Sequence, residues 1–350
     1  MAYYGADTAQ SAYPNAQEFV TEAVNAANSD VNYADFDNDA DGYVDGVYVI
    51  FAGYGQEAGA STDAIWAHAW GIPPVTLDGK TIIGYSCSPE LRGNSDTDIT
   101  RIGVICHELG HVLGAPDYYD TDGAANGAYQ GASFWDLMAA GSWNNRGATP
   151  AHHNAFTKAY YYNWITMTEL IPNQSVTIQP VEFNQDIFFY ASPTTGEYWV
   201  LENRQQVGFD AALPGHGLII HHVDRNNLYN LGRNCINCGH PQRMYPVCAA
   251  ATTNPTSSAA SYGDPAMIFL DGSAWVPGSI DSAACPFPGT GSKTAFTHST
   301  VPTAKAWSGG KSDKSISNIQ EIANDITFDF ALSEPPASPV ATSVLLLLLF

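Results

Sequence analysis

The feature that most constrains this chain is the run from His107 to His111, which reads His-Glu-Leu-Gly-His within an apolar helical stretch. Residues four apart on a helix share one face, so the two imidazoles can bind the same ion. Glu108 lies one step around the helix, where it can hold a metal-bound water without being a ligand. Because zinc lowers the pKa of such a water to about 7, the pattern predicts a catalytic zinc site with Glu108 as general base.

Two residues beyond this helix complete the predicted site. Gly114 ends the helix and lets the chain reverse, so that Asp117 can return as a third ligand and leave the fourth position for water. Two other roles for Asp117 stay open. It could support the ligands without touching the metal, or bind calcium together with Asp120 and Asp122.

Met138, which follows the zinc motif in the sequence, bears on the class of metallopeptidase. Met138 ends the tetrapeptide Trp-Asp-Leu-Met at residues 135–138. An isolated methionine is usually ordinary core, but one in a tight turn beneath a zinc site is typical of metzincin peptidases. The preceding zinc motif therefore favours a methionine turn here.

The elements predicted before residue 166 mix helix and strand. We expect helices over residues 14–28, 98–113 (with Asp98 as N-cap) and about 150–162, a buried strand at 47–52, and a loop over 115–149.

After residue 166 the pattern changes to short runs rich in β-formers, separated by turn residues. These runs are 176–181, 187–191, 198–202, 218–223 and 326–332. The predicted fold class is therefore α+β. We expect a metzincin-like zinc-peptidase domain over residues 1–166, a sandwich-like β-rich domain over 167–333, and a linker with an apolar tail over 334–350.

An acidic loop precedes the first predicted strand and has the alternating spacing of a calcium-binding loop. The expected ligands are Asp37, Asp39, Asp41, the Tyr43 carbonyl and Asp45. Gly42 supplies the sharp turn, but the twelfth position is Tyr48 rather than Glu, so the loop is only related to the standard helix–loop–helix site. A solvated acidic turn is the alternative; repulsion among the carboxylates favours calcium.

The net charge of the chain limits the classes of molecule that it is expected to bind. The chain has 13 Lys and Arg against 35 Asp and Glu, a formal charge of -22. Such a surface repels phosphate backbones and anionic lipid, so nucleic acid is not an expected partner. The apolar run 344–350 is too short to span a bilayer; no stable membrane insertion is expected, and we expect a monomer.

The cysteines indicate an oxidising compartment. Four of the six lie in loop-like sequence, at Cys235, Cys238, Cys248 and Cys285, which favours disulfides in one of three pairings. A structural zinc site at the first two is the alternative. Cys106 falls in the apolar helix and is expected to be a buried thiol.

Other polar residues around the motif have weaker assignments. Either Tyr118 or Tyr119 could stabilise the oxyanion of a tetrahedral intermediate. His152 and His153 are expected to be exposed, with lining of a substrate cleft as the alternative.

In the β-rich half, Glu202 and Arg204 share a strand face and are expected to pair. His221 and His222 alternate on a strand, so only one of them is expected to face the core.

Several segments resemble one bacterial family. The His-Glu-x-x-His-x-x-Gly-x-x-Asp motif at 107–117 is joined by Val-Tyr-Val-Ile-Phe-Ala-Gly at 47–53, Trp-Asp-Leu-Met at 135–138, and segments at 198–204 and 215–224. Together they make the chain similar to the immune inhibitor A-like metallopeptidases, a family related to the metzincins. The resemblance implies a secreted endopeptidase that is made as a zymogen and stabilised by calcium. In that family a prosegment and the first part of the catalytic domain come before the position that corresponds to Met1, and we expect both to be missing from this sequence.

The predicted reaction is therefore hydrolysis of peptide bonds in protein or peptide substrates. Glu108 takes a proton from the attacking water and later passes it to the leaving amine. Two alternatives remain: a calcium-stabilised binding or adhesion module that uses the acidic surface and the β-rich half, and an inactive protease remnant.

Overall fold

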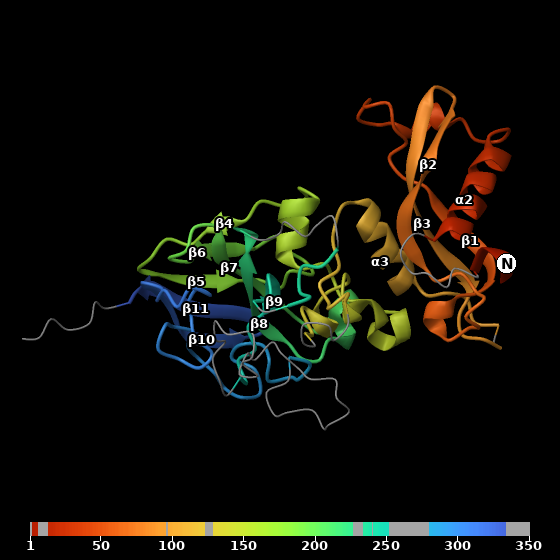
Figure 1. Cartoon of the computed structure of the whole chain (residues 1–350). Helices are drawn as coiled ribbons and strands as arrows, with labels where there is room; N and C mark the ends of the chain where they lie inside the picture. The colour runs from red at the N-terminus through yellow and green to blue at the C-terminus, as the bar shows by residue number, and fades with distance from the viewer. Residues whose placement is uncertain are drawn as a thin grey trace, which may run out of the picture.

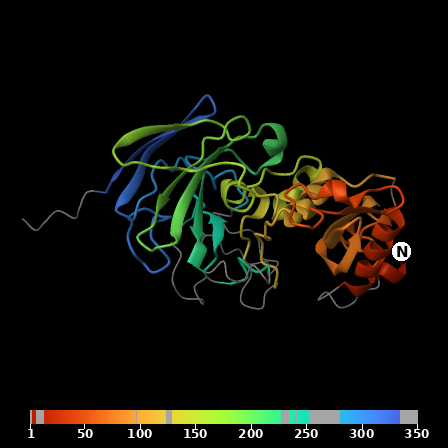
Figure 2. The ribbon, with the colours of Figure 1, turned by 90° about the horizontal axis from the view of Figure 1, so that it is seen from above.

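The computed structural model describes residues 2–5, 13–95, 97–122, 129–226, 234–239, 241–251 and 280–333. The described elements form two bodies that meet around α3 (Ile102–Val112), one coloured red to orange and the other green to blue (Figure 1 and Figure 2). With helices and several sheets in one chain, the architecture is mixed α+β, as predicted. The predicted linker and apolar tail at 334–350 lie outside the described residues.

A three-stranded sheet, in the order β1-β3-β2, is the centre of the N-terminal body. β1 (Tyr48–Tyr54) runs parallel to β3 (Lys80–Leu91), and β2 (His68–Leu77) pairs antiparallel with β3. α2 (Pro14–Ala27) packs against β2 and buries its apolar helix face. The short elements of this body are α1 (Ala2–Gly5), η1 (Tyr33–Phe36) and η2 (Gln56–Ala58).

The sequence indicates α2 and β1 but not β2 or β3. In β2 the pairing shifts between Gly71 and Val75, where Pro73 and Pro74 interrupt the strand. Proline has no backbone N–H to donate to a neighbouring strand, and within sheets it is found only at edges and irregular positions. A pair of prolines therefore argues against a strand when only the sequence is considered. The position of β2 at the sheet edge accommodates both prolines.

The predicted helix over 98–113 begins later than expected. Leu91 forms a bridge with Ile99, and the Arg92 amide donates to the Asp98 carbonyl at 2.8 Å, which keeps this segment extended. Asp98 is therefore not the N-cap, a position that Arg101 occupies.

The end of α3 matches the prediction. The Gly114 amide donates to the His111 carbonyl, and the Ala115 amide donates to the Gly110 carbonyl. This is a Schellman arrangement, and it requires the left-handed backbone that Gly114 adopts at φ +98°. The reversal turns the chain back toward the helix, where Asp117 follows.

The segment after α3 is mostly loop with short helical turns at η3 (Ser133–Trp135) and η4 (Ala140–Gly147). The helix predicted from residue 150 starts only after Asn154, whose Oδ1 accepts from the Thr157 amide at 2.8 Å. Asp136 accepts hydrogen bonds from the Asn154 amide and side chain, which holds the chain extended before this point. The helical turns that follow include η5 (Thr157–Tyr161).

Two sheets form the β-rich body. One has the order β4-β6-β7-β8-β9 and the other β10-β11-β5. Their strands are β4 (Thr168–Glu169), β5 (Gln174–Ile178), β6 (Phe188–Ala191), β7 (Glu197–Arg204), β8 (Gly217–Asp224), β9 (Met244–Pro246), β10 (Lys314–Ile322) and β11 (Asp325–Leu332), with η6 (Gly208–Ala212) after β7. Trp199, Leu201, Ile220, Phe328 and Phe330, from both sheets, share one buried cluster. All five predicted runs are strands, whereas β4, β9 and β10 are not predicted.

A second buried cluster joins the two halves of the chain. Met138 and Phe156 pack in it with Val200, Val223 and Met244 from the β-rich half. The residues around the predicted site thus rest on strands that follow residue 166, and a domain boundary there remains a prediction. Among the described helices, none is long and apolar enough to cross a membrane.

Candidate metal centre

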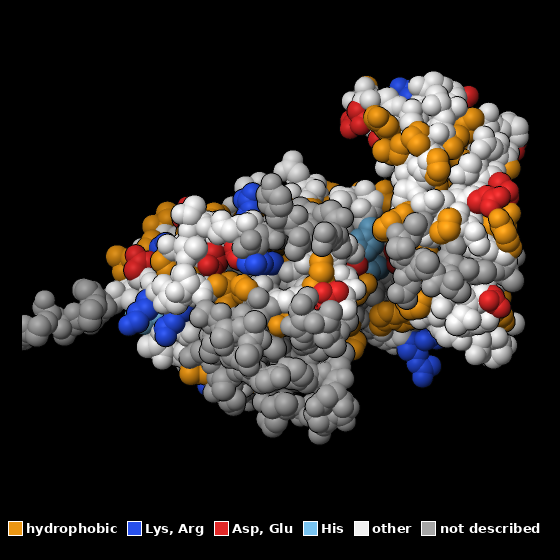
Figure 3. All heavy atoms as spheres, in the orientation of Figure 1, with side chains coloured by type: hydrophobic (Ala, Val, Ile, Leu, Met, Phe, Trp, Pro, Cys, Tyr) orange, Lys and Arg blue, Asp and Glu red, His pale blue; other side chains and the backbone are white. Residues whose placement is uncertain are grey.

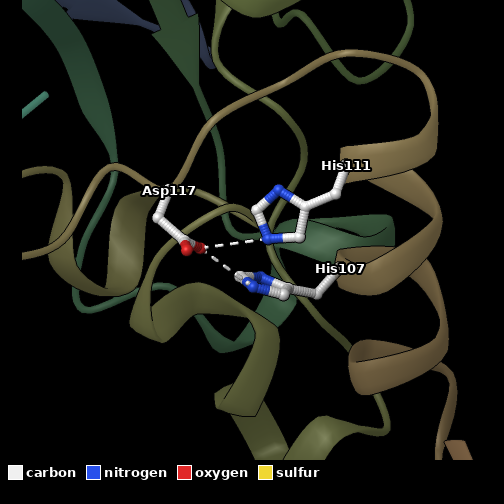
Figure 4. A group of neighbouring side chains, drawn as sticks. All are labelled: His107, His111 and Asp117. Atoms are coloured by element: carbon white, nitrogen blue, oxygen red, sulfur yellow. Dashed lines mark ion pairs between the residues drawn. The ribbon is translucent and has the colours of Figure 1, made fainter. Parts of the chain in front are cut away.

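Three side chains converge beside α3. His107 and His111 project from successive turns of the helix, and Asp117 approaches from the loop that follows (Figure 4). The Asp117 Oδ1 atom lies 3.1 Å from His107 Nε2 and 3.3 Å from His111 Nε2. One donor atom from each residue lies within 4.8 Å of the others, so the three could hold one ion. The structure thus brings together the residues that the motif predicts.

Backbone carbonyls fix both imidazoles. His107 Nδ1 lies 2.7 Å from the Leu137 carbonyl oxygen, and His111 Nδ1 lies 2.8 Å from that of Ala115. A carbonyl can only accept, so each Nδ1 carries a proton, and in the neutral ring each Nε2 presents a lone pair. These lone pairs face the Asp117 carboxylate, and an electron-rich cluster of this kind favours a cation at its centre. Two imidazole nitrogens and one carboxylate oxygen suit zinc.

The same cluster binds protons when no cation competes. Burial lowers the pKa of His107, but the adjacent Asp117 outweighs it and raises the pKa to about 9. Burial also lowers the pKa of His111, but Asp117 again outweighs this effect and raises the pKa. Burial raises the pKa of Asp117, but the two imidazoles outweigh it and hold the pKa below its usual range. A metal ion must therefore displace protons from this site.

Glu108 lies beside the cluster and is almost fully buried, with 8% of its surface exposed. Burial raises the pKa of its carboxyl, while a hydrogen bond from the Ala69 backbone amide opposes the shift. Ala69 belongs to β2, so Glu108 faces the edge of the sheet. A buried carboxylate with a raised pKa is suited to accept and return a proton near neutral pH.

Met138 lies directly beneath α3. A Cβ atom added at Gly110 would be 2.5 Å from Met138 Sδ, so only glycine permits this packing. The Met138 carbonyl also accepts from the Tyr118 amide at 2.8 Å, which ties the turn to the Asp117 loop. Asp136, which the sequence analysis missed, accepts from the Met138 amide at 2.6 Å. An aspartate two residues before the turn residue is a local signal that could have indicated it.

The two tyrosines after Asp117 have different surroundings. Tyr118 is fully buried, and its hydroxyl accepts from Thr157 at 2.8 Å. Tyr119 is partly exposed, and its ring stacks on His107 with a centroid distance of 6.5 Å. Of the two, Tyr119 is the one beside the cluster.

An apolar cavity of about 390 Å³ opens on the Cys106 side of α3. Its lining includes Cys106, Leu137, His152, His153 and Trp164. Burial lowers the pKa of His152 to about 4 and that of His153 to about 3. The default expectation of exposure is therefore wrong for these histidines, and Cys106 is only half-buried because it faces the cavity.

The acidic loop lies on the other side of the cluster. The carboxylates of Asp37, Asp39 and Asp41 are within 4.8 Å of one another, as a cation site requires. Lys80, which the sequence analysis did not consider, forms an ion pair with Asp37 and lowers the pKa of that carboxyl. A calcium ion in this loop would therefore compete with the Lys80 ammonium for the Asp37 carboxylate.

Two other predicted loop residues have separate surroundings. Asp45 accepts from the Asn38 amide at 3.2 Å, and Tyr43 bridges to Thr81. Together with His111, the side chains of Asp39, Asp41, Tyr43 and Asp45 line a hollow of about 640 Å³.

The cysteines of the β-rich half divide into two pairs. Cys235 and Cys238 form a disulfide in this structure. Cys248 and Cys285 are both buried and pack in one cluster.

Arg204 is a buried cation with two buried partners. It pairs with Glu202 at 3.1 Å, as predicted, and with Asp210 at 2.7 Å. His221 and His222 are both buried, because β8 is covered on both faces, so the expectation that only one faces the core is wrong.

Comparison with known proteins identifies relatives of the N-terminal part of the chain. The family "Immune inhibitor A peptidase M6, catalytic domain" matches residues 1–167. Immune inhibitor A of Bacillus thuringiensis subsp. alesti is 32% identical over 164 residues, which cover 40% of this chain and 22% of that protein. The pre-pro-metalloprotease PrtV of Vibrio cholerae serotype O1 is 30% identical over 205 residues, 49% of this chain and 22% of that protein. The aligned part is thus about a fifth of the length of each relative.

Proposed function

Through residues 1–167 the chain belongs to the immune inhibitor A peptidases of family M6, and from this premise we propose that it is a zinc-dependent endopeptidase. The observation that carries the proposal is the convergence of two Nε2 atoms and Asp117 Oδ1 beside α3. His107, His111 and Asp117 would hold the metal. A methionine turn at Met138 beneath this helix supports a metzincin-like site.

The proposed reaction uses water as the nucleophile. A bound zinc ion would polarise the scissile carbonyl and acidify water at neutral pH. Glu108 accepts the proton of the attacking water and returns it to the departing amine, so no covalent enzyme intermediate is needed. Its burial supports this cycle, because a carboxylate with a raised pKa is a stronger base toward the attacking water in the first step. Tyr119, whose ring stacks on His107, is proposed to donate to the developing oxyanion.

The substrate is proposed to bind at the waist between the two bodies, where histidine side chains reach the surface (Figure 3). β2 is the outer strand of its sheet among the described strands, and an extended peptide could pair with its free edge near Glu108. The 390 Å³ cavity beside Cys106 would then receive a large, mainly apolar side chain flanking the scissile bond.

Further proposals concern calcium and the cellular location. The acidic loop at Asp37, Asp39 and Asp41 is proposed to bind calcium and stabilise the N-terminal body. The disulfide at Cys235 and Cys238, and a relative whose name marks it as a pre-pro protein, support export into an oxidising compartment.

The test replaces Glu108 with Gln, which removes the base and leaves the three donor residues intact. We expect this variant to bind zinc as the parent does and to lose casein hydrolysis by at least 100-fold, a size on the order of general-base catalysis. Glu90→Gln, at an exposed position of β3, serves as the matched control and should retain the parent rate. Hydrolysis by Glu108→Gln at the parent rate would rule out this mechanism.

A further inference from the structure

A residue from the β-rich half contacts Asp117 at two points. Asn234 Oδ1 accepts a hydrogen bond from the Asp117 amide at 2.7 Å, and Asn234 Nδ2 donates to Asp117 Oδ2. The other carboxylate oxygen, Oδ1, is the atom that faces the two imidazoles. One asparagine side chain thus holds both the backbone and the carboxylate of this residue.

The two oxygens of the Asp117 carboxylate have different surroundings. Oδ1 is buried and accepts no well-formed hydrogen bond from the described residues, whereas Oδ2 is occupied by Asn234. A carboxylate held through one oxygen cannot rotate freely, so the other oxygen keeps its direction toward the imidazoles. Partners that hold the far side of a metal-binding residue set both its orientation and the affinity for the metal.

Asn234 is itself held by the segment that contains the disulfide. Its backbone carbonyl accepts from Thr121 Oγ1 at 2.6 Å, and the same hydroxyl lies 3.2 Å from Cys238 Sγ. Asn237 also donates to the Tyr118 carbonyl at 2.9 Å. Residues 234–238 therefore clamp the loop from Asp117 to Thr121 along its length.

We propose that Asn234 is a positioning residue for the metal centre, and that the Cys235–Cys238 disulfide clip keeps it in place. This inference rests on the proposed role of Asp117 as a zinc ligand. It adds that the affinity for zinc depends on a residue more than 100 positions away, beyond the part of the chain that matches the peptidase family.

Two substitutions separate the contacts. Asn234 has φ +50°, so Asn234→Gly removes both hydrogen bonds without adding backbone strain. Asn234→Asp keeps the acceptor for the Asp117 amide but replaces the donor with a second negative charge. Asn324→Gly is the matched control, since this exposed asparagine also has a positive φ, at +77°, and lies in the turn between β10 and β11.

The readout is zinc affinity, measured in competition with a chelating dye and without substrate. Both Asn234 variants should raise the zinc Kd by about 10- to 100-fold, the usual effect of losing a residue that orients a ligand. The Cys235→Ser, Cys238→Ser double variant should weaken zinc binding in the same direction, and Asn324→Gly should leave the Kd unchanged.

The outcomes separate the two proposals. A parent chain that binds no zinc overturns the proposed function and this inference with it. A parent that binds zinc tightly, with Asn234→Gly and Asn234→Asp both within twofold of its Kd, overturns the positioning role alone. Thermal melts of the metal-free proteins identify a variant that has lost its fold. If Asn234→Gly does not fold, the zinc Kd of the isosteric variant Asn234→Asp alone tests the positioning role.

Discussion

His107 donates from Nδ1 to the carbonyl oxygen of Leu137 over 2.7 Å. This bond fixes the imidazole tautomer and joins α3 to the residue just before Met138. The turn around Met138 is therefore connected to α3 by a hydrogen bond as well as by packing, and its backbone sets the direction in which His107 Nε2 points.

Packing between α3 and the turn can be tested at Gly110. In Gly110→Ala the new methyl group would meet Met138 Sδ at 2.5 Å and the Tyr162 hydroxyl at 3.0 Å, and Met138 is fully buried, so it has no space to move into. Overpacking costs about 1–3 kcal/mol, more than the gain of up to about 1 kcal/mol in helix propensity. Urea unfolding of the metal-free chain should show that the free energy of unfolding falls by about 1 kcal/mol. Gly84→Ala, where an added Cβ meets nothing within 4 Å, should show no such loss.

Zinc affinity should depend on pH with a definite sign. In the metal-free chain the pKa of His107 is raised to about 9, so below that pH the site holds a proton that zinc must displace. The apparent Kd should therefore fall as pH rises from 6 toward 9 and level off above it. Titrations at several pH values, with a dye calibrated at each, measure this. A Kd that is constant between pH 6 and 9 would contradict the arrangement of His107 and Asp117.

Calcium binding by the acidic loop should appear as thermal stabilisation. Millimolar calcium should raise the Tm of the parent, because a ligand that binds only the folded state stabilises it. Asp39→Asn with Asp41→Asn should abolish the increase, while Asp313→Asn with Asp325→Asn, at positions distant in sequence, should retain it. No calcium-dependent shift in the parent would mean that Lys80 is the cation that this loop uses.

The charge cluster behind the site should be important for stability. Arg204 is fully buried between Glu202 and Asp210, so Arg204→Met removes the guanidinium from both carboxylates and leaves Glu202 with His221 as its remaining ion-pair partner among the described residues. Removing one partner of a buried ion pair costs about 3–5 kcal/mol. Denaturant unfolding should show a loss of that size, whereas Arg101→Met, at a residue that pairs with no described acid, should change stability by less than about 0.5 kcal/mol.

Much of this molecule could be predicted from local sequence. The helix that carries His107 and His111, its end at Gly114 and the main strands of the β-rich half follow from periodicity and turn residues. The start of α3 could not be predicted, because Ile99 is held extended by pairing with Leu91, which is a tertiary contact.

The surroundings of the site could be predicted less well than its core. Asn234 contacts Asp117 across more than 100 residues, and no local pattern announces such a contact. The ion pair of Lys80 with Asp37 likewise depends on how β3 lies against the acidic loop. Spacing along one helix is fixed by geometry, whereas these partners are fixed only once the chain has folded.

The central claim is that His107, His111 and Asp117 bind one zinc ion. The most direct measurement is the metal content of the purified chain after dialysis against zinc and then metal-free buffer. We predict one zinc per folded parent chain and almost none for the His107→Ala, His111→Ala variant. A folded parent without zinc, or equal zinc content in the two proteins, would contradict the account.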